Sequence, residues 1–451
     1  MSTQGVDLAL SPMEAVDRVA GFPGVFALDG GGPASWACGH AIIGVCPRST
    51  LRVLYDGSAV VCEGRESVRW RGDPFDLLER FYRETLPQPA LEPFSGGTLV
   101  ALSYDLRDWT EPRRHRPRRT LEVPVLYAAR YDALLSYDYE KCGYNWRAST
   151  PEGTRQLAEV GARISEMRPA ADLKPALRIR SGSSREDYAT AIHQVLAYIR
   201  AGDIYQANLS QRFVAHGQIS PSALYGAMQR RHPMPFSAYV DGGDFALVSN
   251  SPECFLVRDG GRLSTYPIKG TRPRSADPAS DRRLAVELRN NPKELAEHVM
   301  IVDLERNDLG RVCKTGSIRV DAFARVESFP TLHHLVSQVS GEVAADVPLA
   351  EILRATFPGG SITGAPKIRA MEIIDEIEPV HRGFYTGSIG FLDDCGKATF
   401  NIAIRTAIVS PSQVTYHAGG GIVADSDPQR EYEETLLKAQ PFLNVLRAKA
   451  A

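Results

Sequence analysis

The spacing of hydrophobic positions changes along the chain, and this change separates it into two parts. Within the first 180 residues, apolar positions form short runs that Gly and Pro interrupt, as at 39–45, 51–62 and 98–106. Such runs are typical of β-strands joined by tight connections, and Asp56-Gly57 inside the second run predicts a hairpin turn. A stretch rich in Pro, Ser, Gly and other polar residues follows at 150–185. We therefore predict a β-rich N-terminal lobe over 1–180, interwoven with the core, and a second domain over 181–451.

The second part mixes helical and strand patterns. Apolar residues recur at helical spacing over 188–203, after a capping signal in RSGSSRED, and this pattern stops near Gly202. The same reasoning predicts helices at 280–289, 292–306, 349–354, 366–376 and 430–448. Strands are predicted at 245–249, 398–409 and 413–423. Since many connections between consecutive strands are too short for a crossover helix, the pattern indicates an α+β fold with antiparallel sheets.

Composition and charge exclude several classes of protein. The 52 basic and 54 acidic side chains nearly cancel, leaving a formal charge of −2, so we expect neither nucleic acid nor a membrane surface as a partner. No run of 18 apolar residues and no basic leader followed by an apolar stretch occurs. The seven cysteines are scattered and form no CxxC pair. These features predict a cytoplasmic protein without a disulfide framework or a thiolate zinc site.

One basic run interrupts this balance at Arg113–Arg119. It contains a proline and no aromatic residue is interleaved in it. A solvated loop is therefore favoured over an RNA-binding patch.

Two predicted helices each carry a pair of glutamates three residues apart. Glu294 and Glu297 form one pair, and Glu431 and Glu434 form the other, with Lys438 four residues further on. A spacing of three places each pair on one helical face. Two such faces that converge would offer the oxygen ligands that suit Mg²⁺. Ordinary surface acidity is the alternative, and for either helix alone it is the favoured one.

Lys269, in STYPIKGTRPR, is a candidate nucleophile. Arg272 and Arg274 lie nearby, and neighbouring cations lower the pKa of an amine. A lysine in a basic surface loop is the alternative. His333 and His334 are adjacent in a predicted strand, so only one of them can face a given site.

Glycine is concentrated in three late segments, at 358–367, 385–390 and 418–423. Such segments let backbone N–H groups approach a carboxylate or phosphate, although ordinary turns explain each one equally well. None of them matches a P-loop or a dinucleotide-binding motif.

Taken together, these segments resemble the chorismate-utilising enzymes, the family of anthranilate synthase component I, aminodeoxychorismate synthase component I and the isochorismate synthases. The matches occur in family order over about 185–445, and they read GDIYQANLSQRF, SPECF, YPIKGTRPR, ELAEHVMIVDLERNDLGRV, HHLVS, FPGGSITGAPKIRAMEII, YTGSIGF, NIAIRT and AGGGIVADSDPQREYEETLLKA. The resemblance implies large antiparallel sheets packed against each other with helices outside, and it makes 181–451 a chorismate-binding catalytic domain.

Two positions point to one branch of this family. Gln206 stands where the isochorismate synthases carry a lysine that activates water, and glutamine cannot serve as that base. Lys269, in PIKGT, resembles the aminodeoxychorismate synthases, whereas the other branches carry alanine there. The resemblance thus implies amination of chorismate at carbon 4. Anthranilate synthase component I and a non-catalytic chorismate-binding subunit are the alternatives.

The resemblance also implies roles for individual residues. It makes Lys269 the nucleophile, Glu253 the general acid and His334 a residue near the ring. It assigns Mg²⁺ to Glu297 and Glu434, with Glu294 and Glu431 beside them. It assigns chorismate binding to a larger set, namely Gln206, Thr271, Thr363, Gly364, Ala365, Tyr385, Arg405, Gly419, Gly420, Gly421 and Lys438.

A partner subunit is expected as well. The reaction consumes ammonia, and no glutaminase-like segment with a nucleophilic cysteine is present in the sequence. We therefore expect a separate glutamine amidotransferase subunit to supply the ammonia.

Overall fold

The structure of the protein is a computed structural model. It describes residues 4–6, 10–29, 39–86, 94–111, 122–165, 177–329 and 332–447. The basic run Arg113–Arg119 lies outside these residues. Within them, all strands belong to two antiparallel sheets of twelve strands each.

The strands of each sheet come from distant parts of the sequence. The first sheet has the order β1 (Gln4–Val6), β10 (Gly143–Ala148), β9 (Ala133–Asp138), β3 (His40–Gly44), β2 (Phe26–Asp29), β13 (Phe236–Asp241), β14 (Ala246–Ser251), β23 (Thr406–Ser410), β24 (Gln413–Ile422), β12 (Gln206–His216) and β11 (Arg178–Ser181), with β20 (Gly364–Ala365) beside β12. The second has the order β17 (Ile268–Pro273), β19 (Leu332–Glu342), β16 (Arg262–Tyr266), β15 (Cys254–Asp259), β22 (Ala398–Asn401), β21 (Ser388–Asp393), β7 (Gly97–Leu102), β8 (Leu126–Tyr131), β4 (Ser49–Val53), β5 (Ser58–Glu63) and β6 (Glu66–Arg71), with β18 (Arg319–Ser328) beside β19. Strands of the first 180 residues therefore pair directly with later strands, as β2 does with β13 and β7 with β21.

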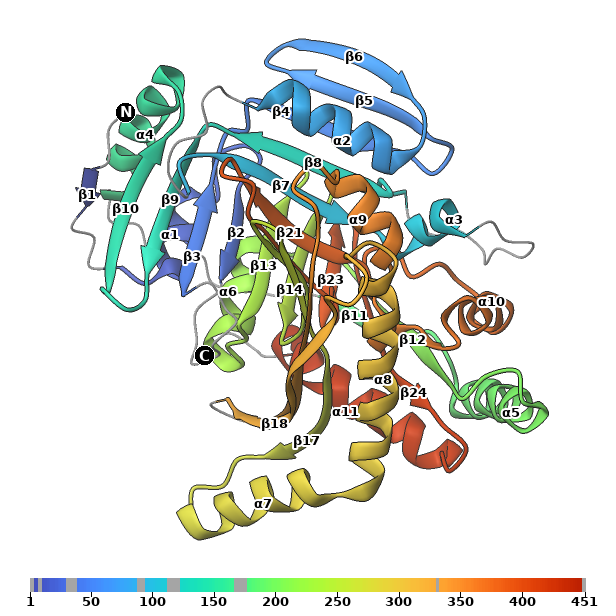
Figure 1. The fold of residues 1–451 in the computed structure, drawn as a ribbon. Coiled ribbons are helices and arrows are strands. Elements are labelled where there is room, and N and C mark those ends of the chain that lie inside the picture. Colours follow the sequence, from blue (N-terminus) through green and yellow to red (C-terminus); the bar gives the residue numbers. More distant parts are fainter. Residues whose placement is uncertain are drawn as a thin grey trace.

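A hydrophobic core lies between the two sheets. Phe26 and Val240 of the first sheet pack in one buried cluster with Leu99, Tyr127 and Phe391 of the second. Because side chains alternate across a strand, the same strands present their other residues to the helices outside. The predicted α+β fold of packed antiparallel sheets is confirmed (Figure 1).

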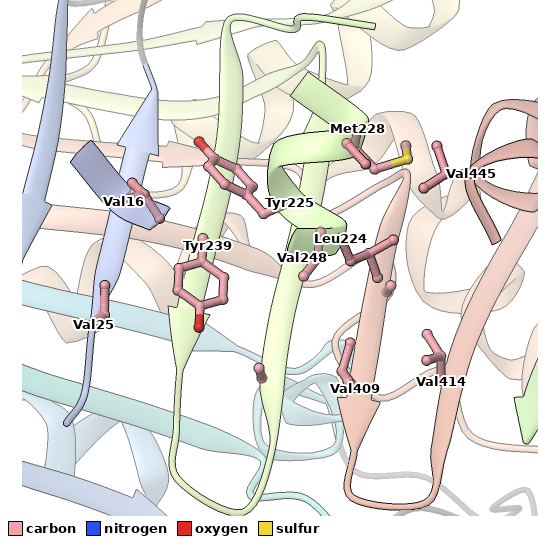
Figure 2. Packing of buried hydrophobic residues seen from close by; sticks show 14 of the residues in the cluster. Val16, Val25, Leu224, Tyr225, Met228, Tyr239, Val248, Val409, Val414 and Val445 are labelled. Carbon is pink, nitrogen blue, oxygen red and sulfur yellow. The ribbon is translucent and has the colours of Figure 1, made fainter. Parts of the chain in front are cut away.

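The helices cover the outer faces of this pair of sheets. They are α1 (Pro12–Val19), α2 (Pro74–Thr85), α3 (Arg107–Thr110), α4 (Pro151–Ser165), α5 (Arg185–Ala201), α6 (Pro221–Arg231), α7 (Pro278–Asn290), α8 (Pro292–Gly310), α9 (Leu349–Thr356), α10 (Lys367–Ile377) and α11 (Pro428–Arg447), with 3₁₀ turns at Tyr104–Leu106 and Gly360–Ile362. In Figure 2, Leu224 and Met228 of α6 lie over Val248 of β14 and near Val445 of α11, in the core outside the first sheet. Among the described residues, no helix has the length and apolar character needed to cross a bilayer.

Most predicted elements are present, and local signals explain their ends. Ser184 caps α5 by accepting the N–H of Asp187, and Gly202 ends that helix in the left-handed region at φ 82°. Asn291 caps α8 in the same way. One prediction was wrong in part, because the single strand expected at 398–409 is two strands in different sheets, β22 and β23. The chain crosses from one sheet to the other at Arg405, whose φ of 50° no continuous strand allows.

Buried charges join the N-terminal part of the chain to the rest. The Arg130 side chain of β8 has 0% exposure, and its guanidinium makes a two-fold hydrogen bond to Asp394, which is 2% exposed and follows β21. Asp132 adds a third acceptor at 3.3 Å. An unpaired guanidinium at this depth is unfavourable, so the pair fixes β8 to β21.

The substitution Asp394→Asn should therefore lower the free energy of unfolding by about 3 kcal/mol, since it leaves Arg130 buried with only Asp132 as a charged partner. The matched control is Glu84→Gln, which breaks the exposed pair of Glu84 with Arg80 and should cost about 0.5 kcal/mol or less. Urea unfolding followed by circular dichroism measures both. Equal effects of the two substitutions would contradict the structural role of the buried pair.

Candidate active site

Lys269 lies on β17, at the edge of the second sheet, and faces the loop that precedes α10. Its Nζ donates to the backbone oxygen of Ser361 in this loop at 3.5 Å. The register of the two strands places Lys269 opposite Leu335 of β19. Helix α8 packs on both β17 and β19. Glu253 lies in the two-residue connection between β14 and β15, where its side chain is buried, and its charge acts on Lys269.

The electrostatics of Glu253 and Lys269 favour the neutral form of both groups. Burial raises the pKa of Glu253, and Ser361 and Lys269 oppose this shift. Burial lowers the pKa of Lys269; Lys438 lowers it further, whereas Glu253 raises it. Both shifts increase the fraction of neutral amine and of protonated carboxyl, the forms in which the two groups act as a nucleophile and a general acid.

The cause of the lowered pKa differs from the one predicted. We expected Arg272 and Arg274 to depress the pKa of Lys269, but both arginines are neutralised by ion pairs. Arg272 pairs with Glu294 at 3.3 Å and Arg274 pairs with Asp281 at 2.9 Å. Burial and Lys438 act on Lys269 instead.

The acidic faces of α8 and α11 lie near each other and near Lys269. Burial raises the pKa of Glu297, and the charge of Glu434 on the facing helix adds to this shift. Both glutamates also act on the pKa of Lys269. The acidic faces of the two helices therefore converge on Lys269. The face of α8 is not purely acidic, because its Val299 side chain is 53% exposed to water.

The other two acidic residues already have partners. Glu294 accepts from Arg272 at 3.3 Å, and Glu431 accepts from the hydroxyl of Ser426 at 2.6 Å. Glu434 is paired with the ammonium of Lys438 at 2.7 Å. Across the described part of the chain, no three His, Cys, Asp or Glu side chains are grouped as a complete metal site. Two facing carboxylates nevertheless match Mg²⁺, which takes few protein oxygens and keeps several waters.

The three consecutive glycines of β24, Gly419, Gly420 and Gly421, lie against α11. Lys438 Nζ donates to the backbone oxygen of Gly419 at 2.9 Å. A side chain at Gly420 would lie 3.5 to 3.6 Å from Glu431, Glu434 and Lys438, so this glycine faces the acidic cluster. β23 pairs with β24 only up to Tyr416, which leaves one edge of the glycine segment open among the described strands. Backbone N–H groups on an open edge are available to an anion.

Gln206 is buried and Arg405 is half-buried, and both are polar groups suited to a ligand. Within the described structure, neither amide atom of the buried Gln206 side chain has a hydrogen-bond partner. Its Nε2 lies 2.8 Å from the position a side chain at Gly421 would take. Arg405 contacts Met234 Sδ at 3.7 Å, and no ion pair of Arg405 occurs in the described ranges. Burial lowers the pKa of Arg405, a cost that a bound carboxylate would offset.

The two histidines separate as the strand pattern predicts. His333 contacts Asp281 and Ser328, away from the site. His334 Nδ1 lies 3.0 Å from Thr271 Oγ1 and 3.3 Å from the Gly270 oxygen, and burial lowers the pKa of His334 to about 4. His334 is therefore neutral, and its Nε2 has no partner among the described residues.

The remaining predicted residues line the loop and the inter-sheet space. Thr363 donates its hydroxyl to the oxygens of Gly359 and Gly360 at 3.1 Å, so we expect this loop to meet a ligand through its backbone. Gly364 and Ala365 form β20 and pair with β12 beside Gln206. The buried Tyr385 ring stacks on His417, with ring centroids 5.1 Å apart.

Sequence analysis missed two residues of this region, Ser361 and Glu305. Ser361 lies inside the segment that supplied Thr363, Gly364 and Ala365, but no pattern in the sequence distinguishes it from the residues around it. Glu305 follows Glu297 by eight residues on α8, which places both on one helical face, and this spacing was a usable signal.

Comparison with known proteins covers both sheets and every site residue above. Residues 45–444 match the family model of the chorismate binding enzymes. The aminodeoxychorismate synthase component 1 of Klebsiella aerogenes is 40% identical over 411 residues, 90% of each chain. The anthranilate synthase component 1 of Thermus thermophilus is 40% identical over 418 residues, 91% of this chain and 90% of that one.

A solved structure of a similar enzyme has the same fold. Anthranilate synthase component I from Streptococcus pneumoniae has a TM-score of 0.80 and 30% identity, covering 92% of this chain and 93% of that chain. The chain therefore belongs to the family of chorismate binding enzymes.

Proposed function

We propose that the protein is the component I of an aminodeoxychorismate synthase, which aminates chorismate at carbon 4 to give 4-amino-4-deoxychorismate. Overall similarity does not choose between this reaction and anthranilate synthesis, because relatives with either name are 40% identical. The observation that carries the proposal is Lys269, a partly buried amine whose pKa is lowered, beside Glu253, a buried carboxyl whose pKa is raised.

In the first step Lys269 attacks carbon 2 of the chorismate ring. The new carbon–nitrogen bond shifts both ring double bonds, and the bond from carbon 4 to its hydroxyl breaks. Glu253 protonates this hydroxyl, which leaves as water. The positive charge of the alkylated lysine is then balanced by the Glu253 carboxylate.

In the second step ammonia attacks carbon 4. The double bonds return to their first positions, and the bond between carbon 2 and Lys269 breaks, so that the lysine leaves as a neutral amine. The new ammonium returns a proton to Glu253. Two successive allylic displacements therefore replace a hydroxyl by an amine at one carbon, while the enolpyruvyl ether is retained.

Other residues of the site hold the substrate during these steps. Arg405 is suited to a carboxylate, because its half-buried guanidinium has no carboxylate partner within the described ranges. Tyr385, Thr271, His334 and Gln206 supply polar groups around the ring. The N–H groups of Gly419–Gly421 and the Lys438 ammonium suit a second anionic group.

Glu297 and Glu434 would hold Mg²⁺, with Glu294 and Glu431 supporting their charge from each helix. The ion would neutralise the ring carboxylate of chorismate and so make the ring more electrophilic. The facing positions of Glu297 and Glu434 support this assignment, since each carboxylate acts on the pKa of Lys269. The Lys438 ammonium, which pairs with Glu434 at 2.7 Å, would have to share that carboxylate with the ion.

The nitrogen source follows from acid–base chemistry. Ammonia is mostly protonated near neutral pH and then cannot attack, so a protected supply is required. We infer that a glutamine amidotransferase subunit delivers it. The product would serve 4-aminobenzoate and folate synthesis in the cytoplasm.

Anthranilate synthesis is the competing function, and Lys269 disfavours it. That reaction aminates carbon 2, where an attached lysine would block ammonia. A non-catalytic role is disfavoured because Glu253, Lys269, Glu297 and Glu434 are all retained and act on one another.

The purified chain, given chorismate, Mg²⁺ and ammonium at alkaline pH, should form 4-amino-4-deoxychorismate. Glutamine in place of ammonium should give no amination, because the chain has no glutaminase segment of its own. Mass analysis of the product and a control with chelator in place of Mg²⁺ complete the experiment. Formation of anthranilate, or amination from glutamine by the chain alone, contradicts the proposal.

Lys269→Ala should lower amination at carbon 4 more than about 1000-fold, since residues that form covalent intermediates act as a unit with their acid. The wild-type protein, quenched with chorismate in the absence of ammonia, should carry an adduct on the peptide containing Lys269. The matched control is Lys397→Ala, which removes an exposed lysine paired with Asp259 and should leave the rate unchanged. If no adduct forms and Lys269→Ala makes the same product at the wild-type rate, the nucleophilic role of Lys269 is wrong.

A further inference from the structure

Glu305 is a buried carboxyl that the proposed reaction does not use. It lies on α8, its side chain is 5% exposed, and it joins three elements of the fold. Oε1 accepts the N–H of Gly360 at 3.0 Å, and Thr265 Oγ1 of β16 donates to Oε2 at 3.3 Å. Burial and the neighbouring Asp308 raise the pKa of Glu305 to about 8. A buried carboxyl with these partners holds them in place whether or not it is ionised.

The N–H that Glu305 holds belongs to the first residue of the 3₁₀ turn Gly360–Ile362. The next residue, Ser361, lies beside both reacting groups: its backbone oxygen accepts from Lys269 Nζ at 3.5 Å, and its side chain is close enough to Glu253 to oppose the rise of that carboxyl's pKa. Gly360, which is bonded to α8, is therefore the direct neighbour in the chain of Ser361, the residue that lies beside the proposed nucleophile and the proposed acid.

The loop has little freedom to move toward α8. A methyl group at Gly360 would lie 2.7 Å from Leu304 Cδ2 and 3.0 Å from Glu305 Oε1, closer than side chains pack. Lys367 fastens the preceding residues, since its ammonium donates to the oxygens of Pro358 at 2.8 Å and Thr356 at 3.1 Å. Glu305 thus holds the part of the loop nearest Lys269, and Lys367 holds its base.

We propose that Glu305 is a positioning residue for the reaction: by fixing Gly360 against α8, it sets the place of Ser361 and through it the alignment of Lys269 with Glu253. The proposal rests on the proposed function through these two groups. Loss of the hydrogen bond would leave chorismate binding to Arg405 and the glycine segment intact while misaligning the attacking amine.

The test compares two substitutions at one position. Glu305→Met keeps the length of the side chain but removes the acceptor, and we expect kcat for chorismate consumption to fall about 10- to 100-fold, with KM changed by less than about threefold. Glu305→Gln keeps an oxygen that accepts from Gly360 and an amide that can bond Thr265, so it should restore kcat to within about threefold of wild type. Adduct formation on Lys269 without ammonia should slow in parallel with kcat.

Two further variants separate positioning from general stability. Gly360→Ala pushes the loop from α8 on the other side of the same bond, so it should reproduce the loss of kcat, and it decides the question if Glu305→Met does not fold. Asp394→Asn breaks a buried ion pair far along the chain and should lower stability without changing kcat or KM.

Three results would overturn the inference: a wild-type kcat in folded Glu305→Met, a wild-type kcat in Gly360→Ala, or a Glu305→Gln protein as slow as Glu305→Met. The product formed by the wild type tests the proposed function separately. The role of Glu305 is measured from ratios of chorismate consumption between each variant and the wild type, so it is decided whichever product is formed.

Discussion

Desolvation of the Lys269 amine beside the Glu253 carboxyl is the constraint on which the site depends. In water near neutral pH the first group would be an ammonium, which cannot act as a nucleophile, and the second would be a carboxylate, which cannot donate a proton. Burial acts on both in the direction of the neutral form, and it is the largest cause of each pKa shift. The remaining charges modulate this effect, with Lys438 opposing the ammonium form and Glu297 and Glu434 favouring it.

The interleaved sheets supply this burial. Lys269 comes from the edge strand β17, Glu253 from the turn before β15, and the loop around Ser361 lies almost a hundred residues later. These segments meet only because strands from distant parts of the chain pair in the same sheets (Figure 1). Buried pairs such as Arg130 with Asp394 fix the register between early and late strands, so the stability of the fold and the geometry of the site have a common origin.

Local sequence patterns predicted what depends on local interactions. Capped helices such as α5, the separation of His333 from His334, and the acidic faces of α8 and α11 follow from spacing alone. The patterns failed where tertiary structure decides. The run at 398–409 is mostly apolar and reads as one strand, yet it passes from one sheet to the other at Arg405. Arg272 and Arg274 are close to Lys269 in sequence but are neutralised by acids of α7 and α8, while Lys438, 169 positions later, is the cation that acts on the amine.

The central claim, that the surroundings of Lys269 lower the pKa of its amine, can be measured directly on the protein in the absence of substrate. Titration of the Lys269 Nζ resonance in protein labelled at lysine, assigned by its loss in Lys269→Ala, gives the pKa of this amine. The account predicts a value below the ordinary lysine value of about 10.4. It also predicts a further decrease in Glu253→Gln, because Glu253 raises the pKa of Lys269. A pKa at or above that of an exposed lysine such as Lys397 would contradict the account.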